Sequence, residues 1–387
     1  MKNLVYLTFF ISIFFSSCKK DNLVKPGRII TISEDIKSNE TWVSENTYII
    51  EGNVDVNSNA VLTIEAGTTI KFEADAELSI AYYNGFGAIK AIGTEDKPIL
   101  FTSNASSKNA GDWEIIWLDS GSSGSEFNYC NFEYGGGYSE LYGMVYLKDT
   151  KASFTNCSFT NSASYGLSLD TDAGLTAFEN NTFNNCYRNP LLIYGNYLHN
   201  LGTGNNFATA TSILVMEDDL DNSGTFTWKN QGVPYNFNGY FRIGSASGTT
   251  IVIEPGTHIN MSSNSEIIVA DHSSKFGIIQ AIGTAEKPIL IGSASPFPAA
   301  GDWRGIWLYE GTGAGTTFEY CTISYGGGYS FGGNILFMKD VGANVNISNT
   351  TISNSDKYGI YRSNVNFDLP TLTNVNFVSN TSGDYNI

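Results

Sequence analysis

The chain of 387 residues is poor in charge and has no long apolar run beyond its N-terminal segment. Only 15% of the residues are charged, and 21 Lys and Arg stand against 38 Asp and Glu, giving a net charge of −17. Nucleic-acid binding needs a basic surface, so this balance argues against a nucleic-acid partner. It also disfavours polyanionic polysaccharides unless a cation bridges them, whereas neutral glycans are unaffected.

Cysteine and histidine are scarce too, at five and three residues. No Cys-x-x-Cys pair is present, so nothing indicates a zinc or iron–sulfur centre. Cys130, Cys157 and Cys321 each stand two positions before an apolar residue expected to point inward. Cys130 and Cys157 are therefore expected at one stacked site on neighbouring coils. An exported protein would tolerate a disulfide there, but buried free thiols are the favoured alternative.

What the chain does have is repetition at two lengths. The long repeat pairs segments 190 or 191 residues apart: AIGTEDKPIL with AIGTAEKPIL, GDWEIIWL with GDWRGIWL, and YCNFEYGGGYS with YCTISYGGGYS, which begin at Ala91, Ala281, Gly111, Gly301, Tyr129 and Tyr320. The short repeat places Phe132, Phe159 and Phe183 at spacings of 27 and 24. Units of this size hold two or three short strands that alternate apolar and polar residues, with Asn, Ser and Gly at the corners.

These two periods predict an all-β fold: a single-stranded right-handed parallel β-helix, or solenoid, made of two tandem copies of a multi-coil unit. We expect copy one over 41–200, an inter-copy segment over 201–227 and copy two over 228–387, stacked as one continuous rod. The residues expected to point into it are Ile99, Ile115 or Ile116, Leu147, Leu167, Ile289, Ile306 and Ile360.

The repeats carry a resemblance to a known family. Asn180–Asn185 (NNTFNN) and Asn374–Phe377 (NVNF) resemble the parallel β-helix repeat of pectin-lyase-like folds, and the A-I-G-T-x-x-K-P-I and G-D-W-x-x-I segments resemble those of secreted β-helix lipoproteins of the Bacteroidota. The resemblance covers about residues 45–387. It implies the fold but no single activity, because this fold hosts lyases, hydrolases, adhesins and scaffolds.

The N-terminus predicts export. Lys2 and the apolar stretch Leu4–Phe15 form a signal peptide over residues 1–17, and Ser16-Ser17-Cys18 resembles a bacterial lipobox. Cys18 would be the lipid-attachment site, followed by a tether over 18–40. We therefore expect an outer-membrane lipoprotein exposed on the cell surface and held to the membrane by its lipid. An ordinary signal peptide with an incidental Cys is the alternative.

No catalytic constellation is evident. The Gly-His-Gly and Arg-x-Lys segments of the β-helix glycoside hydrolases are absent, and Asp112 and Asp302 precede Trp in both copies, as turn-forming residues would. A single acidic cluster, Glu217, Asp218, Asp219 and Asp221, occurs in one copy only. It is compatible with Ca²⁺, which favours several oxygen ligands. A solvated inter-copy loop is the favoured reading, and no cofactor is required.

Aromatic residues give the remaining candidate site. Successive side chains of a strand face opposite sides of the sheet, so if Ile306 and Leu308 point inward, Trp307 points outward. The same alternation predicts outward rings at Phe337, Tyr361, Trp117 and Tyr146. A strip of outward rings on successive coils would stack against the faces of sugars. The alternative is an aromatic ladder that stabilises stacking or lies under the long Gly-rich turns.

Together these observations favour a membrane-anchored, surface-exposed β-helix that acts as a non-catalytic glycan-binding or structural module, with polysaccharide as the expected partner. A polysaccharide lyase or glycoside hydrolase of the same fold is the first alternative, so enzymatic activity stays open. A protein-binding adhesin or scaffold is the second.

Overall fold

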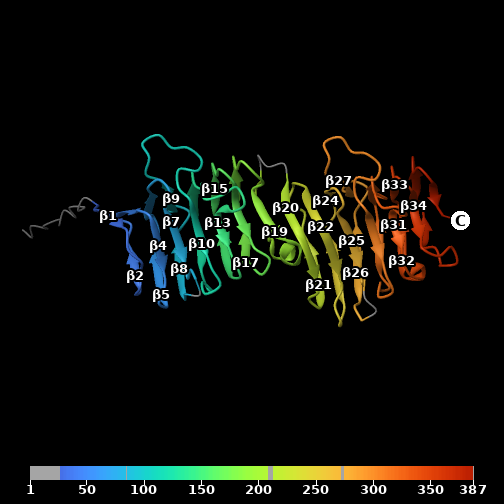
Figure 1. Cartoon of the computed structure of the whole chain (residues 1–387), viewed down its shortest axis with the longest axis horizontal. Helices are drawn as coiled ribbons and strands as arrows, with labels where there is room; N and C mark the ends of the chain where they lie inside the picture. The colour runs from blue at the N-terminus through green and yellow to red at the C-terminus, as the bar shows by residue number, and fades with distance from the viewer. Residues whose placement is uncertain (1–26, 84, 208–211, 272–273, 387) are drawn as a thin grey trace, which may run out of the picture.

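The structure is a computed structural model that describes residues 27–83, 85–207, 212–271 and 274–386. These residues form a right-handed parallel β-helix of about 13 turns with almost no helix, which confirms the predicted fold class. Figure 1 shows one elongated rod in which the colours follow the chain in order from end to end. Each turn contributes strands to three sheets, called sheets 1, 2 and 3 below.

Sheet 1 has a part in each copy. In copy one it contains β1 (Ile29–Ile32), β3 (Thr47–Ile50), β6 (Thr69–Phe72), β9 (Ile99–Ser103), β12 (Cys130–Glu133), β15 (Ser158–Thr160) and β18 (Thr182–Asn184). In copy two it contains β24 (His258–Met261), β27 (Ile289–Ser293), β30 (Cys321–Ser324), β33 (Thr351–Ser353) and β36 (Asn376–Val378).

Sheet 2 begins with β4 (Asn53–Val56), β7 (Glu77–Ile80), β10 (Ile115–Leu118), β13 (Gly143–Leu147), β16 (Tyr165–Leu169) and β19 (Leu191–Tyr194). It ends with β25 (Glu266–Val269), β28 (Gly305–Leu308), β31 (Gly333–Phe337), β34 (Tyr358–Arg362) and β37 (Gly383–Tyr385).

Sheet 3 also has a part in each copy. In copy one it contains β2 (Glu40–Trp42), β5 (Ala60–Ile64), β8 (Gly87–Ile92), β11 (Glu126–Asn128), β14 (Lys151–Thr155) and β17 (Gly174–Glu179). In copy two it contains β21 (Gly224–Trp228), β23 (Thr249–Ile253), β26 (Gly277–Ile282), β29 (Thr316–Glu319), β32 (Val345–Ser348) and β35 (Thr371–Thr373).

Between the copies the pairing continues through two long strands. β20 (Ile213–Leu220) pairs with β19 on one side and β22 (Tyr235–Ile243) on the other. β22 then pairs with β24 through its first half and with β25 through its second half. In sheet 3 the short 3-10 helix η1 (Gly195–Asn200) lies between β17 and β21 and contacts both strands. A second 3-10 helix, η2 (Gly342–Asn344), precedes β32.

The interior is a set of stacked apolar rows, because alternate side chains of each strand face inward. One row consists of phenylalanines whose ring centroids are 4.6–5.1 Å apart and nearly parallel: Phe101, Phe132, Phe159, Phe183 and Phe207. The inward isoleucines and leucines predicted from the sequence are all fully buried, and Ile116 rather than Ile115 belongs to the main core. Cys130 begins β12 and Cys157 directly precedes the neighbouring β15, and both are buried free thiols.

Asparagines form the corners of the coils. Asn156, Asn161 and Asn180 have φ values of 55–56°, and Asn349, Asn354 and Asn374 lie between 48° and 53°. Asn tolerates this left-handed region better than most residues, since its side chain makes local hydrogen bonds. Side-chain ladders such as Asn374 Nδ2 to Asn349 Oδ1 (2.8 Å) connect one coil to the next.

The duplicated motifs are structural. Asp112 Oδ2 accepts hydrogen bonds from Ser103 Oγ (2.7 Å) and the Asn109 amide (2.9 Å), and Asp302 makes the equivalent pair in copy two. A Cβ added at Gly137 would lie 2.5 Å from the Gly111 carbonyl oxygen, so the Gly-Gly-Gly segment is needed for close backbone packing. Each copy therefore repeats the residues that shape the turn between sheets 1 and 2.

Candidate functional site on the outer face of sheet 2

The outer face of sheet 2 carries the predicted aromatic residues, but not as an open strip. Trp117 and Trp307 point away from the interior, yet each is only 7% exposed. Tyr146 is buried as well, while Tyr361 is partly exposed. The expected flat platform of solvent-facing rings is therefore wrong.

Phe337 is a second correction, because it faces the interior. Its backbone pairs with Leu308, which is inward, and its side chain is fully buried in the main core. The residue that pairs with Trp307 is Leu336, which packs on Trp307 outside the coil. The prediction for Phe337 is wrong because the apolar side chain of the preceding residue, Leu336, is buried on the outer face and not in the core.

Two loops cover the outward tryptophans. In copy one, Tyr138 and Tyr142 lie with ring centroids 6.0 and 5.4 Å from that of Trp117. In copy two, Tyr329 and Phe331 lie at 5.8 and 6.0 Å from Trp307. The exposed rings are thus those of the loops that follow the Gly-Gly-Gly segments.

In copy one this aromatic group extends toward β7. Tyr82 packs edge-on against Trp117 (5.7 Å) and against Tyr83 (4.4 Å), and Tyr83 is 81% exposed. Tyr138 is 43% exposed. Tyr83 and Tyr138 therefore present accessible ring surface on one aromatic cluster.

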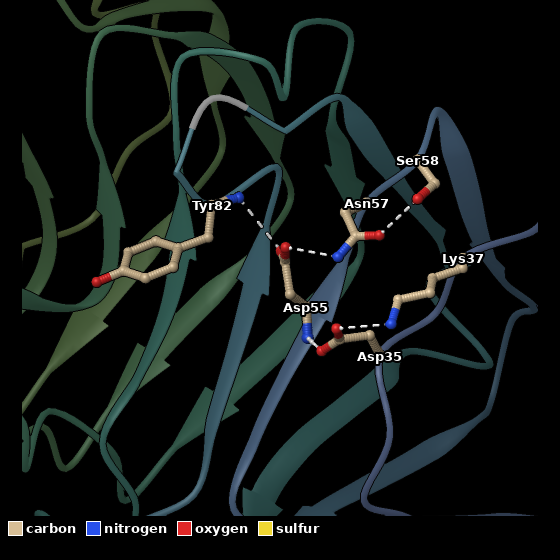
Figure 2. A network of polar contacts seen from close by, with 6 residues as sticks. All are labelled: Asp35, Lys37, Asp55, Asn57, Ser58 and Tyr82. Atoms are coloured by element: carbon tan, nitrogen blue, oxygen red, sulfur yellow. Dashed lines mark hydrogen bonds and ion pairs between the residues drawn. The ribbon is translucent and has the colours of Figure 1, made fainter.

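Carboxylates adjoin the cluster. A cavity of about 300 Å³ is lined by Asp35, Asn53, Val54, Asp55, Glu77, Ser79, Tyr82 and Tyr83. Figure 2 shows how Asp55 is held there: Asn57 Nδ2 donates to Oδ2 (3.0 Å) and the Tyr82 amide donates to Oδ1 (3.2 Å). Asp35 accepts from the Asp55 amide and pairs with Lys37. Glu77 accepts a hydrogen bond from Ser79 Oγ.

Burial changes the acidity of these groups. It raises the pKa of Glu77, which the nearby Asp55 carboxylate raises further, although the Ser79 hydrogen bond opposes this. Burial likewise raises the pKa of Asp55, against the hydrogen bonds from Asn57 and Tyr82. Burial also raises the pKa of Glu114, and the nearby Glu77 carboxylate raises it further. Burial and the Tyr83 hydrogen bond raise the pKa of Tyr82 to about 12.

We call this group the tyrosine–carboxylate site, defined as Asp55, Glu77, Glu114, Tyr82, Tyr83, Trp117, Tyr138 and Tyr142. It combines accessible aromatic rings with carboxylate oxygens, which are suited to accept hydrogen bonds from the hydroxyl groups of a ligand. Sequence reasoning missed its acids, because Asp55, Glu77 and Glu114 come from three different coils and share no local motif.

The equivalent face of copy two carries the opposite charge at two positions. Strand register places Arg242 where copy one has Asp55, and Arg304 replaces Glu114. Arg242 forms ion pairs with Asp219 (3.2 Å) and Asp271 (3.3 Å). The Arg304 guanidinium stacks on the rings of Tyr240 and Tyr329, 5.4 and 5.5 Å from their centroids.

Glu217, Asp218 and Asp219 of the acidic cluster lie on β20, not in the solvated loop that the sequence favoured, and Asp221 follows the end of this strand. Asp219 pairs with Arg242, Asp218 accepts from the Asn196 amide (2.9 Å), and Glu217 approaches the Tyr240 amide (3.4 Å). Burial raises the pKa of Asp218 to about 6. Across the described ranges, no three His, Cys, Asp or Glu side chains are grouped to hold a metal ion, and Asp221 is exposed.

The proposed signal peptide and Cys18 fall within 1–26, outside the described residues. In the part of the chain that is described, no helix has the length and apolar character needed to cross a membrane.

Comparison with known proteins agrees with this architecture. The family described as the pectate-lyase like beta helix domain matches residues 34–137 and 221–338, once in each copy. These ranges make up more than half of the chain, which therefore belongs to this family. No curated protein matches the sequence. Among solved structures, the A-module of the mannuronan C-5 epimerase AlgE4 of Azotobacter vinelandii is 10% identical, with 93% of this chain and 89% of that chain covered and a TM-score of 0.20. Neither the sequence identity nor the TM-score is high enough to transfer an activity from that protein to this chain.

Proposed function

We propose that the protein is an exported, lipid-anchored glycan-binding protein whose binding surface is the tyrosine–carboxylate site. The observation that carries the proposal is the exposure of Tyr83 and Tyr138 beside a cavity that contains Asp55 and Glu77. Aromatic rings stack on the apolar faces of sugars, and carboxylates accept hydrogen bonds from their hydroxyls. A neutral glycan fits best, because the acids of the site and the net charge of −17 would repel an anionic one.

The proposal is tested by titrating the mature protein with neutral hexasaccharides after a glycan array has selected the strongest ligand. Tyr83→Ala and Tyr138→Ala should each weaken binding at least severalfold and leave the melting temperature nearly unchanged, since exposed side chains carry little folding energy. Tyr187→Ala is the matched control, because Tyr187 is 83% exposed but lies between β18 and β19. Equal affinities for all four proteins would reject the site.

Hydrolysis of a glycan is the second candidate, favoured by the raised pKa values of Glu77 and Asp55 at one cavity. Glycosidases use one protonated and one ionised carboxyl group, and burial can separate two such groups in this way. A reducing-sugar assay with wild type and Glu77→Gln distinguishes the two functions. Activity that the variant lacks would favour the enzyme, and unchanged ligand after long incubation would favour simple binding.

Anchoring rests on Ser16-Ser17-Cys18 after a short apolar segment. Cys18→Ala should abolish acylation and release the protein from the membrane fraction, provided that export itself continues. Intact-mass measurement of the wild-type mature protein provides the direct test, and an unmodified Cys18 would contradict the anchor.

A further inference from the structure

The equivalent segments Gly111–Leu118 and Gly301–Leu308 each contain two tryptophans whose indole N–H groups differ. The Nε1 atoms of Trp113 and Trp303 donate to the carbonyl oxygens of Glu133 (2.8 Å) and Ser324 (2.7 Å). The Nε1 atoms of Trp117 and Trp307 are also buried but have no hydrogen-bond partner among the residues that the structure describes. The first pair is thus explained by the fold, and the second pair is not.

An unpaired buried donor is unfavourable, because it loses its hydrogen bond to water and gains none in return. A single case could be an accident of packing. Here the same donor is unpaired at the same register position in both copies, although the residues around it differ in charge and type. A donor that is unpaired at equivalent positions of both copies indicates an acceptor outside the described chain.

The loops that hide these donors run from the Gly-Gly-Gly segments to the first residues of β13 and β31. Gly137 packs closely on the backbone of Gly111 and Trp113, and Gly328 packs in the same way on Gly301 and Trp303. Beyond them, residues 138–142 cover Trp117 with side chains. Ser164 Oγ and Arg188 hold this loop through the Glu140 carbonyl and carboxylate. The loop of copy two is one residue shorter and contains no acidic residue.

We propose that Trp117 and Trp307 are concealed ligand-binding residues. When the loops after the Gly-Gly-Gly segments move aside, each indole N–H donates to a hydroxyl or ring oxygen of a pyranose that packs on the indole ring. This proposal rests on the proposed glycan-binding function and adds a second subsite in copy two.

Replacement of tryptophan by phenylalanine tests the proposal, because it removes the N–H and keeps an aromatic ring. Against the hexasaccharide selected for the wild type, Trp117→Phe should weaken binding roughly three- to tenfold, the loss expected for one neutral hydrogen bond. Trp307→Phe should remove the binding assigned to copy two. Trp113→Phe is the control: it should lower the melting temperature more than Trp117→Phe does and leave affinity unchanged in the folded protein.

Indole N–H signals in ¹⁵N-labelled wild-type protein give a readout independent of stability. Of the six tryptophans, Trp117 and Trp307 should shift on addition of the hexasaccharide, whereas Trp113 and Trp303 should not. Assignment comes from the signal that each Trp→Phe variant lacks. Binding by wild type without any shift of Trp117 and Trp307 would overturn the inference and leave the proposed function intact. Failure of wild type to bind any hexasaccharide would reject the proposed function and, with it, this subsite.

Discussion

Copies one and two share an interior but differ on the outer face of sheet 2. Inside, Ile116 and Ile306 occupy the same position of the same motif, as do Trp113 and Trp303. Outside, Asp55 is replaced by Arg242 and Glu114 by Arg304, so the charge is reversed at two equivalent places. After the duplication, these residues of the coil interior therefore stayed the same, whereas these two residues of the outer face diverged.

This difference between the copies distinguishes the residues that maintain the fold from those that we assign to ligand binding. In copy two the two arginines are engaged by acids and rings of the protein itself, since Arg242 pairs with Asp219 and Asp271 and Arg304 stacks on Tyr240 and Tyr329. In copy one, Asp55 and Glu77 line a cavity beside exposed tyrosines. Among the described residues, copy one thus brings the exposed rings of Tyr83 and Tyr138 together with the carboxylates of Asp55 and Glu77.

The largest expected effect comes from the shared interior. Ile306→Asp buries an unpaired carboxylate and should lower the free energy of unfolding by about 4 kcal/mol or more. Ile116→Asp should cost a similar amount, since both side chains are fully buried. Thr225→Asp on an exposed position of β21 is the control. Chemical denaturation measures the free energy of unfolding of all three variants. An Ile306→Asp variant as stable as wild type would contradict the inward orientation of Ile306.

A smaller effect separates the two tryptophans of one motif. Trp113→Phe leaves the Glu133 carbonyl without its donor and should cost about 2–3 kcal/mol. Trp117→Phe removes a donor that has no partner, so its cost should be clearly lower. Thermal unfolding of the two variants decides the point, and equal losses would show that the indole N–H of Trp113 contributes nothing.

The pH dependence of stability should differ between the copies. Glu77 has a raised pKa in the folded state, so its contribution to stability is present below its unfolded pKa and is lost as the pH rises through its folded pKa. Glu77→Gln should therefore raise the melting temperature at pH 7, with a difference that disappears near pH 4. Glu266→Gln should gain less, because Arg304 and Arg242 favour the ionised form of Glu266. Equal gains from both variants would contradict this electrostatic difference.

The smallest effect concerns the loop of copy one. Arg188→Gln removes an exposed ion pair with Glu140, which should leave the melting temperature unchanged within error. Hydrogen exchange of residues 138–142 should nevertheless become faster, because one of the contacts that hold the loop is lost. Unaltered exchange would show that the Arg188–Glu140 pair does not hold the loop.

The sequence contained most of the information for the fold. Phenylalanines 24 or 27 residues apart correspond to one coil, and their rings stack on adjacent strands as that spacing requires. The repeated Asp112 and Asp302 indicated turn formers, and both accept the hydrogen bonds that close the turn. These features depend on local pattern and period, which a sequence displays directly.

The candidate site was less accessible to sequence reasoning. Outward parity was right for Trp117 and Trp307, but their burial depends on loops that fold back from the Gly-Gly-Gly segments. Glu77 and Asp55 meet only because β4 and β7 pair in a particular register between coils. Alignment of the two copies would have revealed the replacement of Asp55 by Arg242, and this signal was available in the duplication itself.

One exchange between the copies tests the central claim that the divergent outer face of copy one binds the glycan. The measurement is calorimetric titration of a variant in which Asp55→Arg and Glu114→Arg give copy one the residues of copy two. The account predicts that this variant loses the hexasaccharide binding assigned to copy one while its circular dichroism spectrum remains that of the wild-type β-helix, and that Arg304→Glu in copy two leaves the tyrosine–carboxylate site active. Wild-type stoichiometry and affinity in the folded double variant would contradict the claim.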